Sequence, residues 1–344
     1  MADRLRNHQL LNIRKQKRNE EEILMKKMKQ VEPDVQVRST KKSKRLTVIR
    51  SQWEYWLMLV IPVAFFILIR YWPMFGLSIA FQNYRIGDPF ISADAKWVGF
   101  KWFLQLFRNP NFGRLLRNTL TLNVLNILIS FPIAILFALM LNEVRKTWLR
   151  SLTANISLLP YFISTVVIVA IIFNVFSING GLVNEVIKKL GGEQINFMTE
   201  SEWFRPLYIG SGIWQNTGFN AVVFTAAIAG IDPNLYEAAA LDGSSRLKNI
   251  FYITIPCILP TIITMLLLKI GSLMTVGYEK IILMYSPGIY ETADVFATYA
   301  YRAGLENGKH SLSAAISFMN SVCNVILLVS ANKVTRKLSE TALW

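Results

Sequence analysis

The sequence predicts an all-α, polytopic membrane protein that crosses the bilayer six times. Of its 344 residues, 53% are hydrophobic and only 17% are charged, against the roughly 25% charged residues of an average globular protein. Charge and apolarity are also separated along the chain. Residues 1–50 hold 15 Lys and Arg against 6 Asp and Glu and contain no long apolar run. A basic tail of residues 1–50 followed by a transmembrane domain of residues 51–344 is therefore expected.

Six apolar runs approach the roughly 20 residues that a helix needs to cross about 30 Å of hydrocarbon. They cover residues 54–80, 115–141, 152–176, 206–231, 253–276 and 312–331. Aromatic residues end the first run, at Tyr71, Trp72 and Phe75, where an interfacial belt is expected. A basic stretch much longer than the n-region of a signal peptide precedes this run, so it is expected to remain as a span.

The distribution of Lys and Arg predicts that both termini are cytoplasmic. With the tail inside, the basic segment 143–150 and the basic C-terminal end also lie inside. The outer loops 177–205 and 277–311 each hold three Lys or Arg against four Asp or Glu. This asymmetry is typical of loops that have been translocated.

The basic tail has two interpretations. A basic segment beside a span is attracted to anionic inner-leaflet lipid and fixes topology, so membrane lipid is the expected partner. Nucleic-acid binding is the alternative. The tail has neither interleaved aromatic residues nor a nucleic-acid fold signature, and no nucleic-acid partner is predicted.

Signatures of enzymes and metal sites are missing from the sequence. It has no phosphate loop, nucleophile elbow or zinc-protease motif, so no catalytic residue is predicted. With two Cys and two His in the whole chain, neither a disulfide framework nor a His-rich metal site is expected. The stretch of Gly210, Ser211 and Gly212 is attributed to close helix packing by small residues.

Charges inside the predicted spans are scarce. An ion-coupled carrier needs carboxylates or paired charges near the midplane, and the runs contain none. Lys269 is the deepest cation. It could neutralise a carboxylate of a substrate, or it could reach a backbone carbonyl or the membrane interface.

The most informative segment is residues 231–256, between the fourth and fifth runs. Asp232 is a good N-cap, Pro233 suits the first helical position, and Gly243 permits a left-handed turn after a run of alanines. Ser244 or Ser245 can cap a second helix, which Pro256 and Pro260 are expected to bend or break. The sequence therefore predicts two short helices at an angle, which form a cytoplasmic knob.

This segment resembles the EAA signature loop of ABC-importer permeases. Glu237, Ala238 and Ala239 are followed at the family's spacing by Gly243 and by residues 253–256, where Ile255 replaces the usual Leu. Other parts are similar to maltose-type sugar permeases, in particular to their polysaccharide and complex-carbohydrate branch. These parts are residues 97–100, 102–103, 118–119, 173–181, 213–214 with Gly218, 278–288 and 290–294.

The resemblance implies an ABC type I importer permease fold in a bacterial plasma membrane. It also implies a second homologous permease subunit, two ATPase subunits that bind ATP and Mg, an extracellular solute-binding protein and a sugar substrate. The chain itself would hold no cofactor. The residues implied in coupling to the ATPase are Glu237, Ala238, Ala239, Asp242 and Gly243.

The expected substrate path consists of aromatic and polar residues in or beside apolar spans, because sugars stack on aromatic faces and form hydrogen bonds. The candidates are Trp214, Gln215, Asn216, Phe219, Asn220, Tyr278, Glu279 and Tyr285. Amides within spans also hold helices together, and aromatics also mark interfaces. A role in packing is therefore the alternative for each of them.

Import of an oligosaccharide or polysaccharide fragment is the predicted function. The alternatives are an ABC permease for a non-sugar solute, an ion-coupled carrier or channel, and a membrane scaffold with a basic tail.

Overall fold

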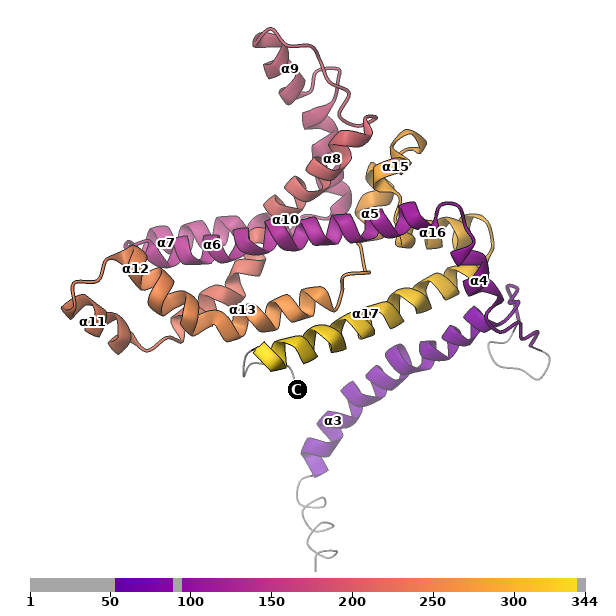
Figure 1. Cartoon of the computed structure of the whole chain (residues 1–344), viewed down its shortest axis with the longest axis horizontal. Helices are drawn as coiled ribbons and strands as arrows, with labels where there is room; N and C mark the ends of the chain where they lie inside the picture. Colours follow the sequence, from indigo (N-terminus) through magenta and orange to yellow (C-terminus); the bar gives the residue numbers. More distant parts are fainter. Residues whose placement is uncertain (1–52, 89–94, 339–344) are drawn as a thin grey trace, which may run out of the picture. The chain divides into compact units, whose positions relative to one another are not determined.

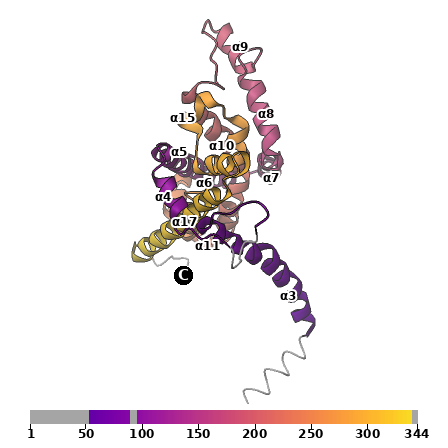
Figure 2. The same ribbon diagram turned by 90° about the vertical axis from the view of Figure 1, so that its right-hand side faces the viewer.

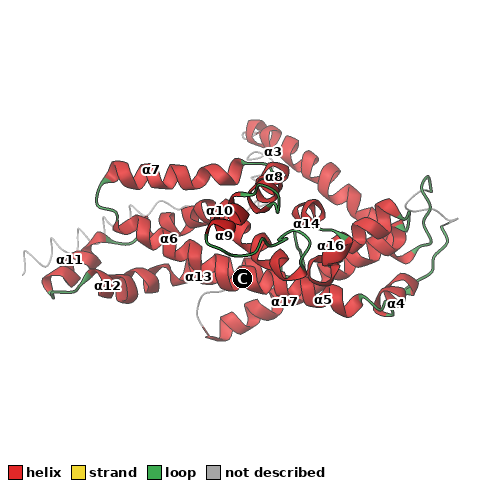
Figure 3. Cartoon of the chain, turned by 90° about the horizontal axis from the view of Figure 1, so that it is seen from above, coloured by secondary structure: helices red, strands yellow, loops and turns green. Residues whose placement is uncertain are grey.

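The computed structural model describes residues 53–88 and 95–338. The predicted basic tail of residues 1–50 lies outside the described residues. Within the described ranges the chain is helical, its only β-type pairing is an isolated bridge between Gln82 and Trp97, and no strand is drawn (Figure 3). The expected all-α class is confirmed.

The chain divides into two compact units, Met1–Tyr71 and Trp72–Trp344. In the first unit, the described elements are α3 (Trp53–Phe66) and the π-helical turn η1 (Ile67–Tyr71). Every residue of α3 is exposed, although almost all are apolar. An exposed apolar helix of this kind is suited to lipid.

The second unit consists of successive helices, and the longest of them pack against one another. In chain order its elements are η2 (Trp72–Phe81), α4 (Lys101–Phe107), α5 (Phe112–Leu125), η3 (Asn126–Ser130), α6 (Phe131–Glu143), α7 (Thr147–Leu158), η4 (Leu159–Phe162), α8 (Thr165–Phe176), α9 (Leu182–Lys189), α10 (Ser201–Ala229), α11 (Pro233–Leu241), α12 (Arg246–Asn249), η5 (Ile250–Thr254), α13 (Ile255–Ile270), α14 (Tyr278–Met284), η6 (Pro287–Ile289), α15 (Tyr290–Ala293), α16 (Phe296–Tyr301), η7 (Arg302–Glu306) and α17 (His310–Leu338).

Within this unit, α5, α6, α10, α13 and α17 run alongside one another (Figures 1 and 3). Small residues such as Ala138 and Ala221 let α6 and α10 approach, and Phe224 and Ile258 fill the space between α6, α10 and α13. A second apolar cluster joins α5, α16 and α17 around Phe296. These two clusters are among the apolar contacts that hold the long helices together.

The third predicted span consists of two helices. The segment Thr147–Phe162 and α8 meet at a break of two residues and are bent by 97°. Ser164 caps α8, since its hydroxyl accepts a hydrogen bond of 3.4 Å from the Val167 amide. As a result, α8 and α9 rise away from the long helices (Figures 1 and 2).

Four helical segments are long and apolar enough to cross a membrane, and there are five if the bent pair is one span, among the described residues. The four are Trp53–Phe81, Phe112–Glu143, Arg246–Ile270 and His310–Lys337. The fourth predicted span forms the 29-residue helix α10. Its Gln, Asn, Ser and Thr residues lower its hydropathy, so it does not join that group.

The fifth predicted span differs from expectation in where its helix ends and in the effect of its prolines. Its helix ends at Ile270, before Gly271, rather than near Val276. Pro256 follows the π-helical turn η5 within a helix that continues from Arg246 to Ile270, so it does not break the helix. Pro260 is accommodated inside α13 without ending it.

The tightest helix contact depends on Gly218 of α10. A Cβ atom built there would overlap the Ser157 backbone of α7, whereas one at Gly210 would meet nothing within 4 Å. The Gly210 stretch is thus not a packing contact within this chain, contrary to expectation. Gly218 serves that purpose instead.

We expect Gly218→Val to lower the melting temperature of the purified protein in detergent, because overpacking of this kind costs about 1–3 kcal/mol or more. Gly210→Val adds the same volume to the same helix at an open position and is the matched control. Equal melting temperatures for the two variants would contradict the proposed importance of the contact.

Candidate functional site

The segment after α10 has the capped helix–turn–helix geometry that the sequence predicts. Asp232 accepts a hydrogen bond of 3.0 Å from the Asn234 amide at the start of α11. At its end, Gly243 has φ +71°, and the Ser244 amide donates to the Ala239 carbonyl at 2.9 Å. This pair of features is a Schellman ending. Ser245 then caps α12 through the Lys248 amide.

Helix α11 presents its surface to solvent. None of its residues is buried, Glu237 and Ala238 are exposed, and Leu241 is 91% exposed. A capped helix none of whose residues is buried offers its surface for contact with another protein.

Two contacts attach this segment to the long helices. The hydroxyl of Tyr236 in α11 lies 2.9 Å from that of Thr254, which is 2% exposed and precedes α13. Arg246 of α12 lies 3.8 Å from Glu143 at the end of α6. The first of these contacts joins α11 directly to the residue that precedes α13.

A pocket of about 280 Å³ lies between the long helices, just below the roughly 300–1,000 Å³ of typical ligand sites. Along α10 its lining extends from Tyr208 to Phe224, roughly 24 Å at 1.5 Å per residue. We call it the central pocket. Its lining is Asn126, Ile127, Ser130, Phe131, Ala134, Tyr208, Ile209, Gly212, Ile213, Gln215, Asn216, Thr217, Asn220, Phe224, Met265, Lys269 and Lys280.

Lys280 of α14 is the most buried cation of the central pocket, with 9% of its surface exposed. Its Nζ donates a hydrogen bond of 3.2 Å to the Tyr208 carbonyl and lies 5.0 Å from the centre of the Tyr208 ring. Burial lowers the pKa of Lys280 to about 8, so its ammonium form still predominates at pH 7.

Polar groups line the rest of the pocket, and some of them are unused. The Ser130 hydroxyl is buried and has no hydrogen-bond partner. Asn216 donates its amide to the Gly212 carbonyl at 2.9 Å, which leaves its side-chain oxygen available as an acceptor. The pocket can therefore accept and donate hydrogen bonds to a polar ligand.

The structure divides the predicted path residues among several places. Gln215, Asn216 and Asn220 line the central pocket. Trp214 lines a separate apolar groove beside α8, and Phe219 stacks on Tyr161 at 4.0 Å between ring centres.

The three remaining path residues lie outside the central pocket. Tyr278 is half exposed and stacks on Tyr301, Glu279 is exposed, and Tyr285 accepts a hydrogen bond of 3.3 Å from Arg302. The role of these residues in transport stays a prediction.

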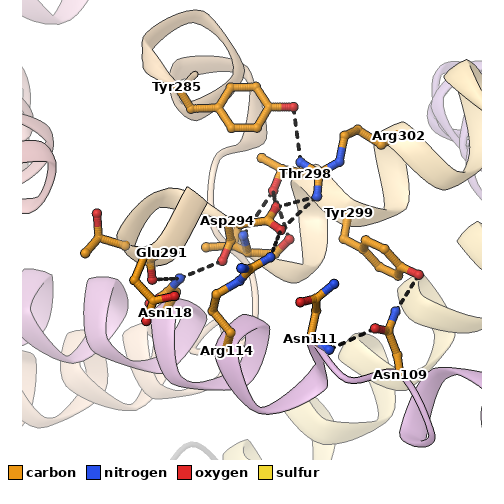
Figure 4. A network of polar contacts seen from close by, with 12 residues as sticks. Asn109, Asn111, Arg114, Asn118, Tyr285, Glu291, Asp294, Thr298, Tyr299 and Arg302 are labelled. Carbon is orange, nitrogen blue, oxygen red and sulfur yellow. Dashed lines mark hydrogen bonds and ion pairs between the residues drawn. The ribbon is translucent and has the colours of Figure 1, made fainter. Parts of the chain in front are cut away.

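A polar network centred on Asp294 joins α5 to the segment from α14 to η7 (Figure 4). Its carboxylate is 1% exposed, accepts two hydrogen bonds of 2.8 Å from Arg302 and lies 3.5 Å from Arg114. Thr298 donates a further bond of 2.8 Å. The buried charge is thereby fully paired.

Asn118 and Thr119 extend this network to the backbone. The Asn118 amide donates to the carbonyls of Glu291 and Asp294 at 2.9 and 3.0 Å, and its oxygen accepts from Arg205. Thr119 accepts from the Phe296 amide at 3.2 Å. Both side chains are buried, so their place at the start of the second span has a structural reason.

Comparison with known proteins adds the decisive observation. Residues 130–340 match the family described as binding-protein-dependent transport system inner membrane component. The chain belongs to this family.

Curated relatives of the permease cover nearly its whole length. It is 40% identical over 313 residues to the polygalacturonan/rhamnogalacturonan transport system permease protein YteP of Bacillus subtilis, with 90% of this chain and 97% of the relative covered. It is 39% identical over 296 residues to protein LplB of the same organism, with 86% and 92% covered.

A solved structure agrees with the family. A chain of the bacterial alginate ABC transporter, in complex with an alginate pentasaccharide-bound periplasmic protein, superimposes with a TM-score of 0.79 at 39% identity. The match covers 86% of this permease and 99% of that chain. The permease is thus a multi-pass component of the cell membrane with the fold of ABC-importer permeases, and it is a transport subunit rather than an enzyme.

Sequence reasoning did not find several residues that organise these sites. Lys280 meets Tyr208 and Asp294 meets Arg114 only through tertiary packing, and Ser130 reaches the central pocket in the same way. Tyr236 lies beside the EAA residues in the sequence, but its contact with Thr254 could not be predicted from their spacing.

We expect Asp294→Asn to destabilise the permease strongly, since removal of one member of a buried ion pair costs about 3–5 kcal/mol. Thermal unfolding in detergent would measure the loss. Glu291→Gln is the matched control, because Glu291 is exposed and pairs with the exposed Arg117 at 2.6 Å.

The bond from Arg117 lowers the pKa of Glu291, but solvent screens that pair. The control should therefore unfold close to the wild-type temperature. If the two variants unfold together, the Asp294 network is not the stabilising element.

Proposed function

We propose that the protein is the membrane permease subunit of an ATP-driven importer for an oligosaccharide or polysaccharide fragment. An extracellular solute-binding protein delivers the sugar. Support comes from relatives whose names specify polygalacturonan, rhamnogalacturonan and alginate and from the polar central pocket. The observation that carries the proposal is the capped, solvent-exposed helix α11, which is attached to α13 through Tyr236 and Thr254.

The proposed complex contains a second, homologous permease and two ATPase subunits that bind ATP and Mg. Glu237 contacts the ATPase, Ala238 and Ala239 allow close approach, and Asp242 and Gly243 form the turn to α12. Closure of the ATPase pair moves α11, and the contact of Tyr236 with Thr254 passes the motion to α13. Residues 231–256 thus act as the coupling loop of the domain of residues 51–344.

We also propose that both termini are cytoplasmic and that the tail of residues 1–50 contacts anionic lipid of the inner leaflet. The coupling loop then faces the ATPases. The segments before α10 and around α14 face the binding protein.

Glu237→Lys and Gly243→Val are expected to reduce import at least tenfold while the protein remains in the membrane. The first reverses the charge at the docking surface. The second forces a β-branched residue to adopt φ +71°, at a cost of about 1–3 kcal/mol, and redirects α11. Uptake and ATP hydrolysis would be measured in proteoliposomes with the complete complex and the loaded binding protein.

Gly243→Asn is the control for this turn, because asparagine tolerates the left-handed conformation. It should retain most of the import. If Glu237→Lys and Gly243→Val, tested as single variants, both import sugar at the wild-type rate, the loop is only a connector.

The orientation predicts which cysteines an impermeant maleimide can reach on intact cells. In a background without the two native residues, Cys257 and Cys323, cysteines at Glu193 and Asn307 should react. A cysteine at Ser244 should react only after permeabilisation. Labelling of Ser244 on intact cells would reverse the proposed orientation.

A further inference from the structure

The central pocket is cationic. Two lysines, Lys269 and Lys280, line it together with amides, hydroxyls and apolar groups, and no carboxylate is among the described residues that line it. The ion pairs found in the described part of the chain also involve neither lysine. The pocket therefore carries positive charge without a protein counter-ion.

Of the two lysines, Lys280 has the greater need of a counter-ion, because it is buried. An ammonium group has three donors, and the single hydrogen bond described for Nζ is to the Tyr208 carbonyl. The ring of Tyr208 compensates part of the charge. A buried charge that lacks an ion partner is costly, so an anion within reach would stabilise it.

Gly212, one turn after Tyr208 on α10, places no side chain beside the ammonium. A Cβ atom built on Gly212 would lie 3.9 Å from Nζ, so any larger side chain there would occupy the space beside the ammonium. Lys269 lies in the last turn of α13, one turn beyond Met265, which also lines the pocket. Both cations thus serve the same cavity from different helices.

An independent observation also indicates a ligand. The buried Ser130 hydroxyl has no partner in the protein, and it belongs to the π-helical turn η3, which lines the same pocket. Turns of this type are frequent at functional sites. A hydroxyl-rich ligand would satisfy Ser130 and the free oxygen of Asn216.

We propose that the central pocket binds an anionic saccharide, whose carboxylate is held by Lys280 and Lys269 and whose hydroxyls bond to Ser130 and Asn216. This inference rests on the proposed import of saccharides and specifies their chemical class as acid sugars. Lys280 contacts Tyr208 in the first part of α10, the end that the proposed orientation places outside. The carboxylate would be held where the sugar enters.

The first experiment separates this inference from the proposed function. Uptake of labelled trigalacturonate and trimannuronate, and of their carboxyl-reduced neutral forms, is measured in cells with and without the chain. We expect chain-dependent uptake of at least one acidic trisaccharide and at least tenfold less of its neutral form. Uptake of neutral forms alone, or of both equally, overturns the inference and leaves saccharide import intact. No chain-dependent uptake of any of the four overturns both.

The second experiment tests the lysines in the complete transporter. Lys280→Gln and Lys269→Gln should each reduce uptake of the acidic sugar at least tenfold, and Lys280→Arg should retain uptake within about threefold. Lys309→Gln removes the same charge at an exposed position in the same predicted outer segment and should leave uptake unchanged.

Melting temperatures of the purified variants show whether the fold is retained. Wild-type uptake by folded Lys280→Gln, or an equal loss in Lys309→Gln, would overturn the assignment of the pocket.

Discussion

The buried carboxylate of Asp294 is the constraint on which the arrangement of the segment from α14 to η7 depends. A charge removed from water must be paired, and its partners come from α5 and η7. Asn118 adds bonds to the backbone of the same segment. Together they fix the chain after α14, which is the helix that carries Lys280 into the central pocket. A network with no contact to that pocket thus holds the chain that follows one of its walls.

Helix α10 has to satisfy two opposing requirements. A helix within a bilayer needs its polar groups satisfied internally, yet a path for a hydrated solute needs polar groups. Thr217, Asn216 and Thr225 meet the first requirement by bonding to carbonyls one turn back on their own helix. Gln215 bonds to the Ile163 carbonyl, which the break between η4 and α8 exposes. Polarity and helix packing are therefore compatible on the same helix.

The sequence was sufficient to predict those features of the structure that depend on residues close together in the chain. The capped helix and turn of residues 231–256 follow from Asp232, Pro233 and Gly243 alone, because capping and turn chemistry involve residues a few positions apart. The polar residues of α10 also indicated the pocket. Lys280 and Ser130 could not be placed, since they come from helices far apart in the chain. The bend of 97° before α8 was missed as well, because apolarity continues across it.

Two π-helical turns share a feature with a mechanical consequence. Both η3 and η5 lead into helices with proline in the first turn, at Pro132 and Pro256. Proline has no N–H, so the carbonyl one turn earlier has already lost its usual donor. Flexing at either position is therefore opposed by one fewer backbone hydrogen bond, and helices preferentially kink at such points. Helix α6 has one such position, whereas α13 has a second at Pro260, so each helix is least stiff near its prolines.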